Sequence, residues 1–291
     1  RGSEEKKIKK EFVVNADARL LIDNSYGHVN IVSWSENRTV IEVHVKTNGN
    51  NEEKVQEKLD EIDVYFSLQP DHVIAKTQIE ENWSLKFFKS ARIQYRIDYT
   101  IKLPRSSKVD LTNDYGSIAL NALDGSAKIH CDFGKLLIGA LNSENNILNF
   151  DYTNNSSFDF IRGGKIQADF SSFDVEEAGA IELEADYTTS EFKTLQELDF
   201  KNDFGKLIIG QINSLRGKGD YLTLKIETLF HDTELDNEFG LIRINQVMPT
   251  TKSIEIHSEY TAIQLGISPD WEFNHEIDLE FANLKSSLNL D

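Results

Sequence analysis

Apolar and polar residues alternate along most of this chain, and a recurring acidic–aromatic pair interrupts the alternation at regular intervals. The phrases NDYGSIAL, NDFGKLIIG and NEFGLIRI, which begin at Asn113, Asn202 and Asn237, are copies of one motif. The aromatic residue of the pair recurs with gaps of 17 to 21 residues, at Tyr115, Phe133, Tyr152, Phe170, Tyr187, Phe204, Tyr221, Phe239, Tyr260 and Phe281. A period of this length indicates a solenoid, in which each repeat forms one coil and neighbouring coils share a core.

The residues before each aromatic residue have the pattern of a β-strand. The fourth residue before it is apolar in nine of the ten repeats, with Gly217 as the exception. The second residue before it is often small, as at Cys131 and Ala168. Because side chains alternate between the two faces of a strand, we expect these positions and the aromatic residue itself to face inward. The sequence therefore predicts a stack of aromatic rings inside a parallel β-helix.

A second alternating run follows each pair, as at Leu136 and Ile138, after a Gly, Ser or Thr in most repeats. These small residues suit a bend, so each coil is predicted to contain two or three short strands joined by corners. Propeller repeats are about 40 residues long, and β-hairpins need a turn signal at each reversal. Neither matches, and we predict an all-β fold with a single-stranded parallel β-helix of about ten coils over residues 105–291.

The first third of the chain has a different pattern. Residues 37–47 and 91–104 are longer alternating strands. The segment between them, residues 50–62, has the spacing of an amphipathic helix, with apolar residues at Val55, Leu59 and Ile62. We predict that residues 1–104 contain a first coil at Tyr26, followed by a strand–helix–strand element that caps the open N-terminal end of the solenoid.

Composition excludes several classes of partner. The formal net charge is −18, from 49 acidic and 31 basic side chains, and such a field repels nucleic acid and anionic lipid. No apolar run approaches the ~18 residues that a membrane-spanning helix needs. The one cysteine, Cys131, cannot form an intramolecular disulfide, and its inward position predicts a buried thiol.

The residue before each aromatic residue is acidic in all ten repeats. Stacked coils would place these carboxylates in one outward column, where unit charges ~4 Å apart repel by about 1 kcal/mol even in bulk water. One explanation is a cation-binding column, with calcium as the cation. Its candidate ligands are Asp132, Asp151, Asp169, Asp186, Asp203 and Asp220. The simpler explanation is that each carboxylate accepts a hydrogen bond from the backbone of the bend that follows it.

A second candidate site lies in residues 81–96, where Trp83, Phe87 and Phe88 occupy a predicted loop. Exposed aromatic side chains can form a contact surface for sugars or proteins, although such residues also pack beneath loops. The seven histidines form no HxH, HExxH or Cys/His cluster, so the sequence predicts no zinc site. Nucleophile-elbow, phosphate-loop and dinucleotide motifs are absent as well, so no cofactor and no catalytic residue is predicted.

The phrases LLIDNSYGHVNIVSW, RTVIEVHVKT and LTNDYGSIAL resemble a bacterial putative-adhesin family of envelope β-solenoids. The residues that carry the opening motif of that family are Asn24, Tyr26, Gly27 and Val29. The resemblance implies a right-handed parallel β-helix that is exported across the inner membrane of a Gram-negative bacterium, to the periplasm, the outer membrane or the cell surface. The chain begins RGSEEKK without an initiator methionine, which suggests a processed or an engineered start. A processed start would agree with a removed signal peptide. The family defines no active site.

We therefore expect a non-catalytic exported solenoid that binds or scaffolds a polysaccharide or an envelope protein. The alternative is a pectin-lyase-like enzyme that processes acidic polysaccharide. Arg162, Arg216 and Arg243 are the arginines of the regular coils, and none lies in a lyase-like motif. An acidic surface would also repel a polyuronate.

Overall fold

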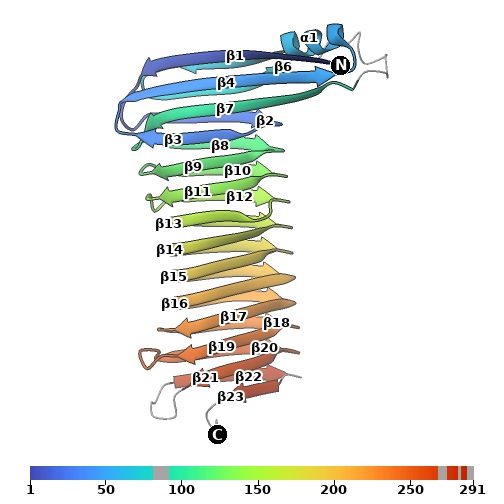
Figure 1. Ribbon diagram of the computed structural model, residues 1–291. Helices are drawn as coiled ribbons and strands as arrows, with labels where there is room; N and C mark the ends of the chain where they lie inside the picture. The colour runs from blue at the N-terminus through green and yellow to red at the C-terminus, as the bar shows by residue number, and fades with distance from the viewer. Residues whose placement is uncertain (81–91, 268–273, 281–282, 287–291) are drawn as a thin grey trace. The chain divides into compact units, whose positions relative to one another are not determined.

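The structure is a computed structural model that describes residues 1–80, 92–267, 274–280 and 283–286. The chain is an all-β solenoid, and α1 (Glu52–Glu61) is the one helix among the described residues. It divides into two compact units, Arg1–Leu141 and Asn142–Asp291, and each unit contains stacked coils (Figure 1). The predicted all-β class is thus confirmed. The division at residue 104, which separated a cap from the coils, stays a prediction.

The coils of the first unit consist of two parallel sheets joined by corners. Its strands are β1 (Gly2–Val13), β2 (Arg19–Ser25), β3 (Val29–Trp34), β4 (Arg38–Gly49), β5 (Ile62–Leu68), β6 (His72–Ile79), β7 (Gln94–Pro104), β8 (Lys108–Asp114), β9 (Ser117–Leu123), β10 (Ala127–Asp132) and β11 (Lys135–Leu141). One sheet pairs β2, β8 and β10, so that Ile22, Leu111 and Ile129 lie in register. The other sheet pairs β3, β9 and β11.

The second unit repeats this arrangement with twelve described strands, of which four are 14–16 residues long. They are β12 (Asn146–Asp151), β13 (Ser156–Asp169), β14 (Ser172–Asp186), β15 (Thr189–Asp203), β16 (Gly205–Asp220), β17 (Leu222–Leu229), β18 (Thr233–Glu238), β19 (Leu241–Val247), β20 (Ser253–Glu259), β21 (Ala262–Ile267), β22 (Asn274–Glu280) and β23 (Asn283–Ser286). Strands β13 to β16 run through one corner without a break and pair in parallel along both sheets (Figure 1). Equivalent residues such as Ile166, Leu183 and Phe200 therefore stack directly.

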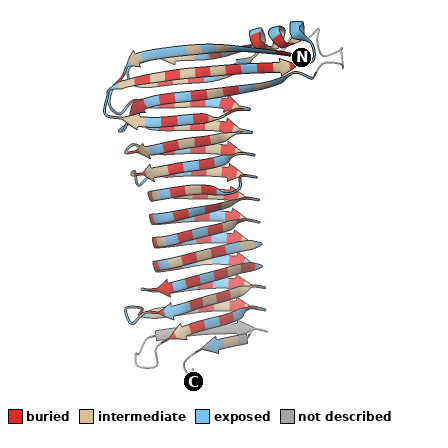
Figure 2. Cartoon of the chain, viewed as in Figure 1, coloured by how far each residue is buried: buried red, intermediate tan, exposed pale blue. Residues whose placement is uncertain are grey.

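Side chains alternate along the strands between the core and the solvent (Figure 2). The positions four residues before the aromatic residue are buried, as predicted: Leu111 and Ile129 are 1% exposed and Leu183 is 0% exposed. Cys131 is also buried, and its thiol donates to the carbonyl oxygen of Gly116 at 3.5 Å. The hydrophobic pattern of the sequence therefore identifies correctly the core residues that precede the acidic–aromatic pair of each repeat.

The prediction of an internal aromatic stack is wrong. Ten aromatic residues, from Tyr26 to Tyr260, are 41–52% exposed, and Phe281 lies outside the described residues. All ten have a positive φ between 47° and 61°. In this left-handed conformation the residue no longer continues the strand, so the two-residue alternation ends one position earlier and the ring points outward. The same residues thus form the corner between the two sheets.

The predicted strands and helix of the first 104 residues are present. Asn51 caps α1 by accepting a hydrogen bond from the backbone N–H of Lys54, and Val55 and Leu59 are buried. Strand β4 pairs antiparallel with β1 and with β7. Strands β7 and β6 in turn pair parallel with β3 and β2 of the first coil, and β6 pairs antiparallel with β5.

Candidate functional site

The aromatic residues at the corner form stacked columns within each unit. In the first unit, Tyr115 stacks between Tyr26 and Phe133 at centroid distances of 4.9 and 5.0 Å. In the second unit, neighbouring rings lie 4.7–5.0 Å apart with interplanar angles of at most 9°, through Tyr152, Phe170, Tyr187, Phe204, Tyr221, Phe239 and Tyr260. Both faces of an inner ring are therefore covered by its neighbours. These rings present edges to the solvent and leave no face on which a sugar could stack.

The column in the first unit has a defined end. The ring of Tyr95 on β7 lies edge-on to Tyr26, with centroids 5.4 Å apart and an interplanar angle of 68°. The ammonium group of Lys58 lies 5.2 Å from the centroid of Tyr95. The stack of parallel rings thus ends at Tyr26, because the next ring is turned across it.

The acidic residues beside the rings bind backbone N–H groups of the neighbouring coil. In the first unit, the N–H of Asp132 donates to Oδ1 of Asp114 at 2.9 Å. The same contact recurs at 2.9–3.1 Å in the second unit, where the acceptors are Asp151, Asp169, Asp186 and Asp203. The donor is the equivalent acidic residue of the next coil, whereas the sequence predicted the bend of the same coil. This hydrogen bond offsets part of the repulsion along the column.

Burial and the neighbouring charges raise the pKa of two carboxyl groups in the column. The pKa of Asp169 is raised, first by burial and then by the charges of Asp151 and Asp186, against the opposing effect of its backbone hydrogen bond. The pKa of Asp220 is raised by burial and by the charges of Asp203 and Asp236. The proposed calcium ligands Asp132, Asp151, Asp169, Asp186, Asp203 and Asp220 therefore form the predicted acidic columns, within each unit. Calcium binding by them stays a prediction.

A group with metal-ligand chemistry lies in the first unit. Among the described residues, Asp114, His130 and Asp132 are the one set of three acidic or imidazole ligands whose atoms lie within 4.8 Å of one another. The Nε2 atom of His130 is 3.1 Å from Oδ2 of Asp132 and 3.7 Å from Oδ1 of Asp114. The sequence search missed this group because its members come from two coils and match no short motif.

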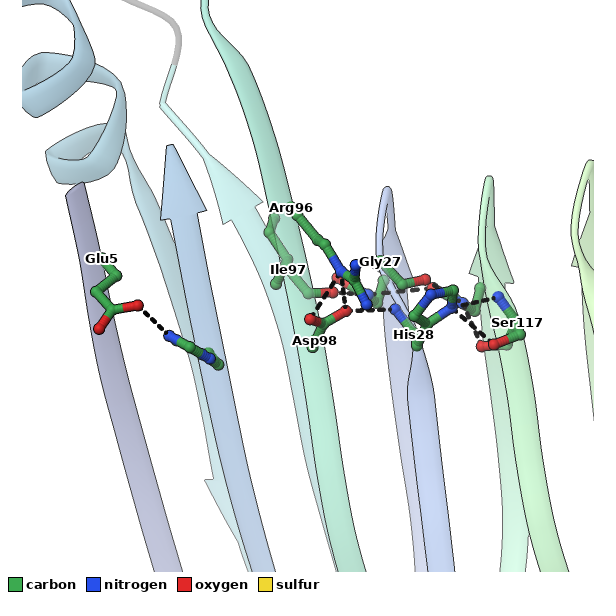
Figure 3. Close-up of polar contacts among 10 residues, drawn as sticks. Glu5, Gly27, His28, Arg96, Ile97, Asp98 and Ser117 are labelled. Carbon is green, nitrogen blue, oxygen red and sulfur yellow. Dashed lines mark hydrogen bonds and ion pairs between the residues drawn. The ribbon is translucent and has the colours of Figure 1, made fainter. Parts of the chain in front are cut away.

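Two other histidines of the first unit, His28 and His44, contact residues of neighbouring strands (Figure 3). The Nδ1 atom of His28 accepts a hydrogen bond from the backbone N–H of Ser117 at 3.0 Å, and the N–H of His28 donates to Oδ1 of Asp98. Asp98 also accepts from the guanidinium of Arg96 at 2.9 Å. The ring of His44 lies 2.9 Å from the carboxylate of Glu5. These contacts tie β3 to β7 and β9, and β1 to β4.

The second unit carries a shallow groove of about 950 Å³, lined by residues that lie five to eight positions before the corner aromatic residues. Seven of its lining residues are acidic and two are basic: Glu144, Glu182, Glu197, Asp199, Asp232, Glu234 and Glu255, with Lys165 and Arg216. Its floor includes the apolar side chains of Ile181, Leu198 and Leu215. The groove is therefore an acidic surface over an apolar base.

One outward position of each coil forms the axis of this groove. The residues in register along it are Ile147, Lys165, Glu182, Asp199, Arg216, Glu234 and Glu255. Six strand spacings of ~4.8 Å give this row a length of about 29 Å. Each of these residues lies five positions before an aromatic corner residue, so the row could have been identified from the repeat.

Both cations of the row are paired with acids of the adjacent coil. Arg216 donates to Oδ2 of Asp199 at 2.8 Å, and this contact raises the pKa of the guanidinium. The ammonium group of Lys165 lies 3.8 Å from Oε1 of Glu182. The lining consequently has an excess of five negative charges, seven acids less two bases.

The candidate residues of the predicted loop are not placed. Trp83, Phe87 and Phe88 lie outside the described residues, and their role in binding stays a prediction. None of the acidic corner residues lines the groove. In the part of the chain that the structure describes, no helix is long and apolar enough to cross a membrane.

The fold defines the class of this protein as a β-solenoid. No family model and no curated protein matches the chain. It is similar to a solved structure described as a putative adhesin from Parabacteroides distasonis ATCC 8503, with 10% identity, a TM-score of 0.46 and 97% of each chain covered. A putative adhesin from Parabacteroides merdae ATCC 43184 gives 10% identity, a TM-score of 0.45 and the same coverage. A putative cell adhesion protein from Clostridium sporogenes ATCC 15579 gives 11% identity and a TM-score of 0.20, over 98% of this chain and 100% of that one. These descriptions agree with the family resemblance of the sequence motifs, while identities this low transfer no function.

Proposed function

We propose that this chain is a non-catalytic binding β-solenoid, an exported adhesin of the cell envelope that holds an extended partner in the groove of the second unit. The observation that carries the proposal is the row from Ile147 to Glu255, in which one outward side chain per coil lies in register along the groove. A straight row about 29 Å long suits a linear chain, as extended surfaces of repeat proteins do.

The charge of the groove favours a basic segment of a protein as the partner. Seven carboxylates against two cations attract lysine and arginine side chains, and both cations are already paired. The apolar floor at Ile181, Leu198 and Leu215 suits the aliphatic stems of such side chains. At about 3.3 Å per residue, an extended segment of roughly nine residues spans the row.

The alternative of a pectin-lyase-like enzyme on acidic polysaccharide fits the groove less well. A polyuronate would meet an excess of carboxylates, which repel it. Arg216, the one arginine in the lining, is held by Asp199. A basic group that is already neutralised is poorly suited to bind a substrate carboxylate.

The proposal includes a right-handed winding, a capping role for the N-terminal element, and a location in the periplasm, the outer membrane or the cell surface of a Gram-negative bacterium. Support for the cap comes from β6 and β7, which occupy the outer edges of β2 and β3 in the first coil. Strands with paired edges no longer offer a template for another chain.

The test is a binding measurement with four probes: a lysine–serine decapeptide, its glutamate–serine counterpart, a chitosan oligosaccharide and polygalacturonate. We expect the basic peptide to bind and to weaken steeply with added salt, because exposed charges are screened. Binding should be reduced at least threefold in the Glu197→Gln/Glu234→Gln variant. It should not change in Glu191→Gln, an exposed acid outside the groove.

Other outcomes contradict parts of the proposal. Binding of chitosan without binding of the peptide would overturn the protein partner and retain the groove. Cleavage of polygalacturonate would overturn the non-catalytic function. Equal binding by the groove and control variants would show that the groove is not the binding surface.

A further inference from the structure

Asp114, His130 and Asp132 lie together on one outer face of the first unit, remote in sequence from the groove. Asp114 ends β8, and His130 and Asp132 lie at the end of β10, so the group joins two adjacent coils. All three side chains are partly exposed, at 31%, 42% and 29%. The group is therefore accessible to an ion from solvent.

The spacing of the three ligand atoms fits a small divalent cation. Zinc binds imidazole nitrogen and carboxylate oxygen at about 2.0–2.2 Å, and tetrahedral geometry then separates two ligand atoms by about 3.4 Å. The Nε2 atom of His130 lies 3.1 Å from Oδ2 of Asp132 and 3.7 Å from Oδ1 of Asp114. These two separations bracket the tetrahedral value.

The backbone holds the ligands in place without a metal. Oδ1 of Asp114 accepts the N–H of Asp132 at 2.9 Å, and this contact fixes the carboxylate relative to the next coil. A carboxylate held by such a hydrogen bond is the usual arrangement around metal ligands. Both β8 and β10 are paired strands, so the backbone has little freedom to spread the group.

His130 is a histidine at a position where most other coils carry a different residue type. It lies three residues before a repeat aromatic, where other repeats carry Asp23, Thr112, Asn149, Gln167, Glu184, Lys201, Lys218, Asp236 and Asp278. His257 is the other imidazole at this position, and it lies 2.9 Å from Glu255. Among the side chains that the structure describes, it belongs to no group of three ligands. The chain thus provides its own matched control.

We propose that Asp114, His130 and Asp132 bind a zinc-type divalent cation through three protein ligands and leave one coordination position open. The ion would join β8 to β10 across two coils and stabilise that part of the first unit. Imidazole is a poor ligand for calcium, which prefers oxygen, so this site differs in chemistry from the acidic columns. It does not depend on the groove or on its partner.

The test uses the full chain, freed of metal by a chelator that is then removed, and titrated with zinc chloride by calorimetry. We expect binding of one zinc ion per chain and a rise in Tm, and cobalt(II) should give the visible absorption of a tetrahedral site. His130→Gln should weaken zinc binding at least tenfold, and His257→Gln should leave it unchanged.

A second variant separates metal binding from folding. Asp114→Asn keeps an oxygen that can accept the N–H of Asp132 and removes the charged ligand, so its Tm without metal should match that of the wild type. Its zinc affinity should still fall at least tenfold. The proposal is overturned if the wild type binds no zinc at 1 mM, if His130→Gln binds as well as the wild type, or if calcium binds this site as tightly as zinc.

Discussion

The ring of Phe204 lies parallel to the ring of Tyr221, with their centroids 4.8 Å apart, although the backbone of both residues is left-handed. Non-glycine residues adopt this conformation at a cost of about 1 kcal/mol or more each. This conformational cost recurs in every described coil with an aromatic residue at the corner. Stacking between neighbouring coils offsets it, because each inner ring contacts two others.

Replacement of Phe204 tests this balance. Phe204→Ala removes the contacts with Tyr187 and Tyr221, each worth about 0.5–1.5 kcal/mol, so we expect a loss of about 1–3 kcal/mol in the free energy of unfolding. Phe204→Tyr should be nearly neutral, since tyrosine occupies equivalent corners. Phe204→Gly should be less destabilising than Phe204→Ala, because glycine adopts a positive φ without strain. Urea unfolding curves measure all three. Equal stability of the alanine variant and the wild type would contradict the role of the stack.

The raised pKa of Asp169 predicts a pH dependence. A carboxyl group whose pKa is higher in the folded than in the unfolded state favours folding when protonated, so its contribution is present at low pH and is lost as the pH rises through the folded pKa. Asp169→Asn mimics the protonated form and keeps an acceptor for the N–H of Asp186. We expect its Tm to equal that of the wild type at pH 3 and to exceed it at pH 7, where the wild-type carboxyl group is charged. A lower Tm at pH 7 would show that the negative charge stabilises the fold.

Arg216 should affect binding and stability in different ways. Its ion pair with Asp199 is exposed, with side-chain exposures of 68% and 54%, and such pairs contribute at most about 1 kcal/mol. Arg216→Gln should therefore leave Tm nearly unchanged. It also makes the groove more negative, so the affinity for the basic decapeptide should rise two- to fivefold. A fall in affinity would show that Arg216 itself contacts the partner.

Gly116 is expected to tolerate no side chain. A Cβ atom built there would lie 1.6 Å from the carbonyl oxygen of Gly27 in the adjacent coil. Because a backbone atom cannot move aside as a side chain can, Gly116→Ala should destabilise the fold by about 3 kcal/mol or more. The control is Gly2→Ala, whose nearest contact is the flexible side chain of Glu52. Thermal unfolding of the two variants provides the comparison.

Tyr115 and Gly116 explain why the sequence predicted the coils correctly and the aromatic rings wrongly. Burial at Leu111 and Ile129 follows from alternation alone, since each residue packs against its equivalent in the next coil. At the corner, conformational preference assigns the left-handed φ to glycine, but Tyr115 adopts it. Glycine is needed for the close approach to Gly27, and that contact lies between coils. A local pattern contains no information about it.

The candidate sites show a similar division. The repeat contains the row through Glu182, Asp199 and Arg216, but the groove itself is lined by residues of several coils. The group at His130 depends on the register between β8 and β10, which places Asp114 within reach. Both sites are formed by residues of different coils. A search for motifs within one continuous segment of the sequence therefore does not detect them.

The crosswise placement of Tyr95 against Tyr26 has a consequence for assembly. A column of parallel rings offers its last open face to any similar column, and a second molecule could add its own rings there and start a fibre. Here that face is covered by the edge of the Tyr95 ring, inclined at 68°, and the ammonium group of Lys58 lies beside that ring. Head-on polymerisation through the aromatic column is thereby blocked at this end.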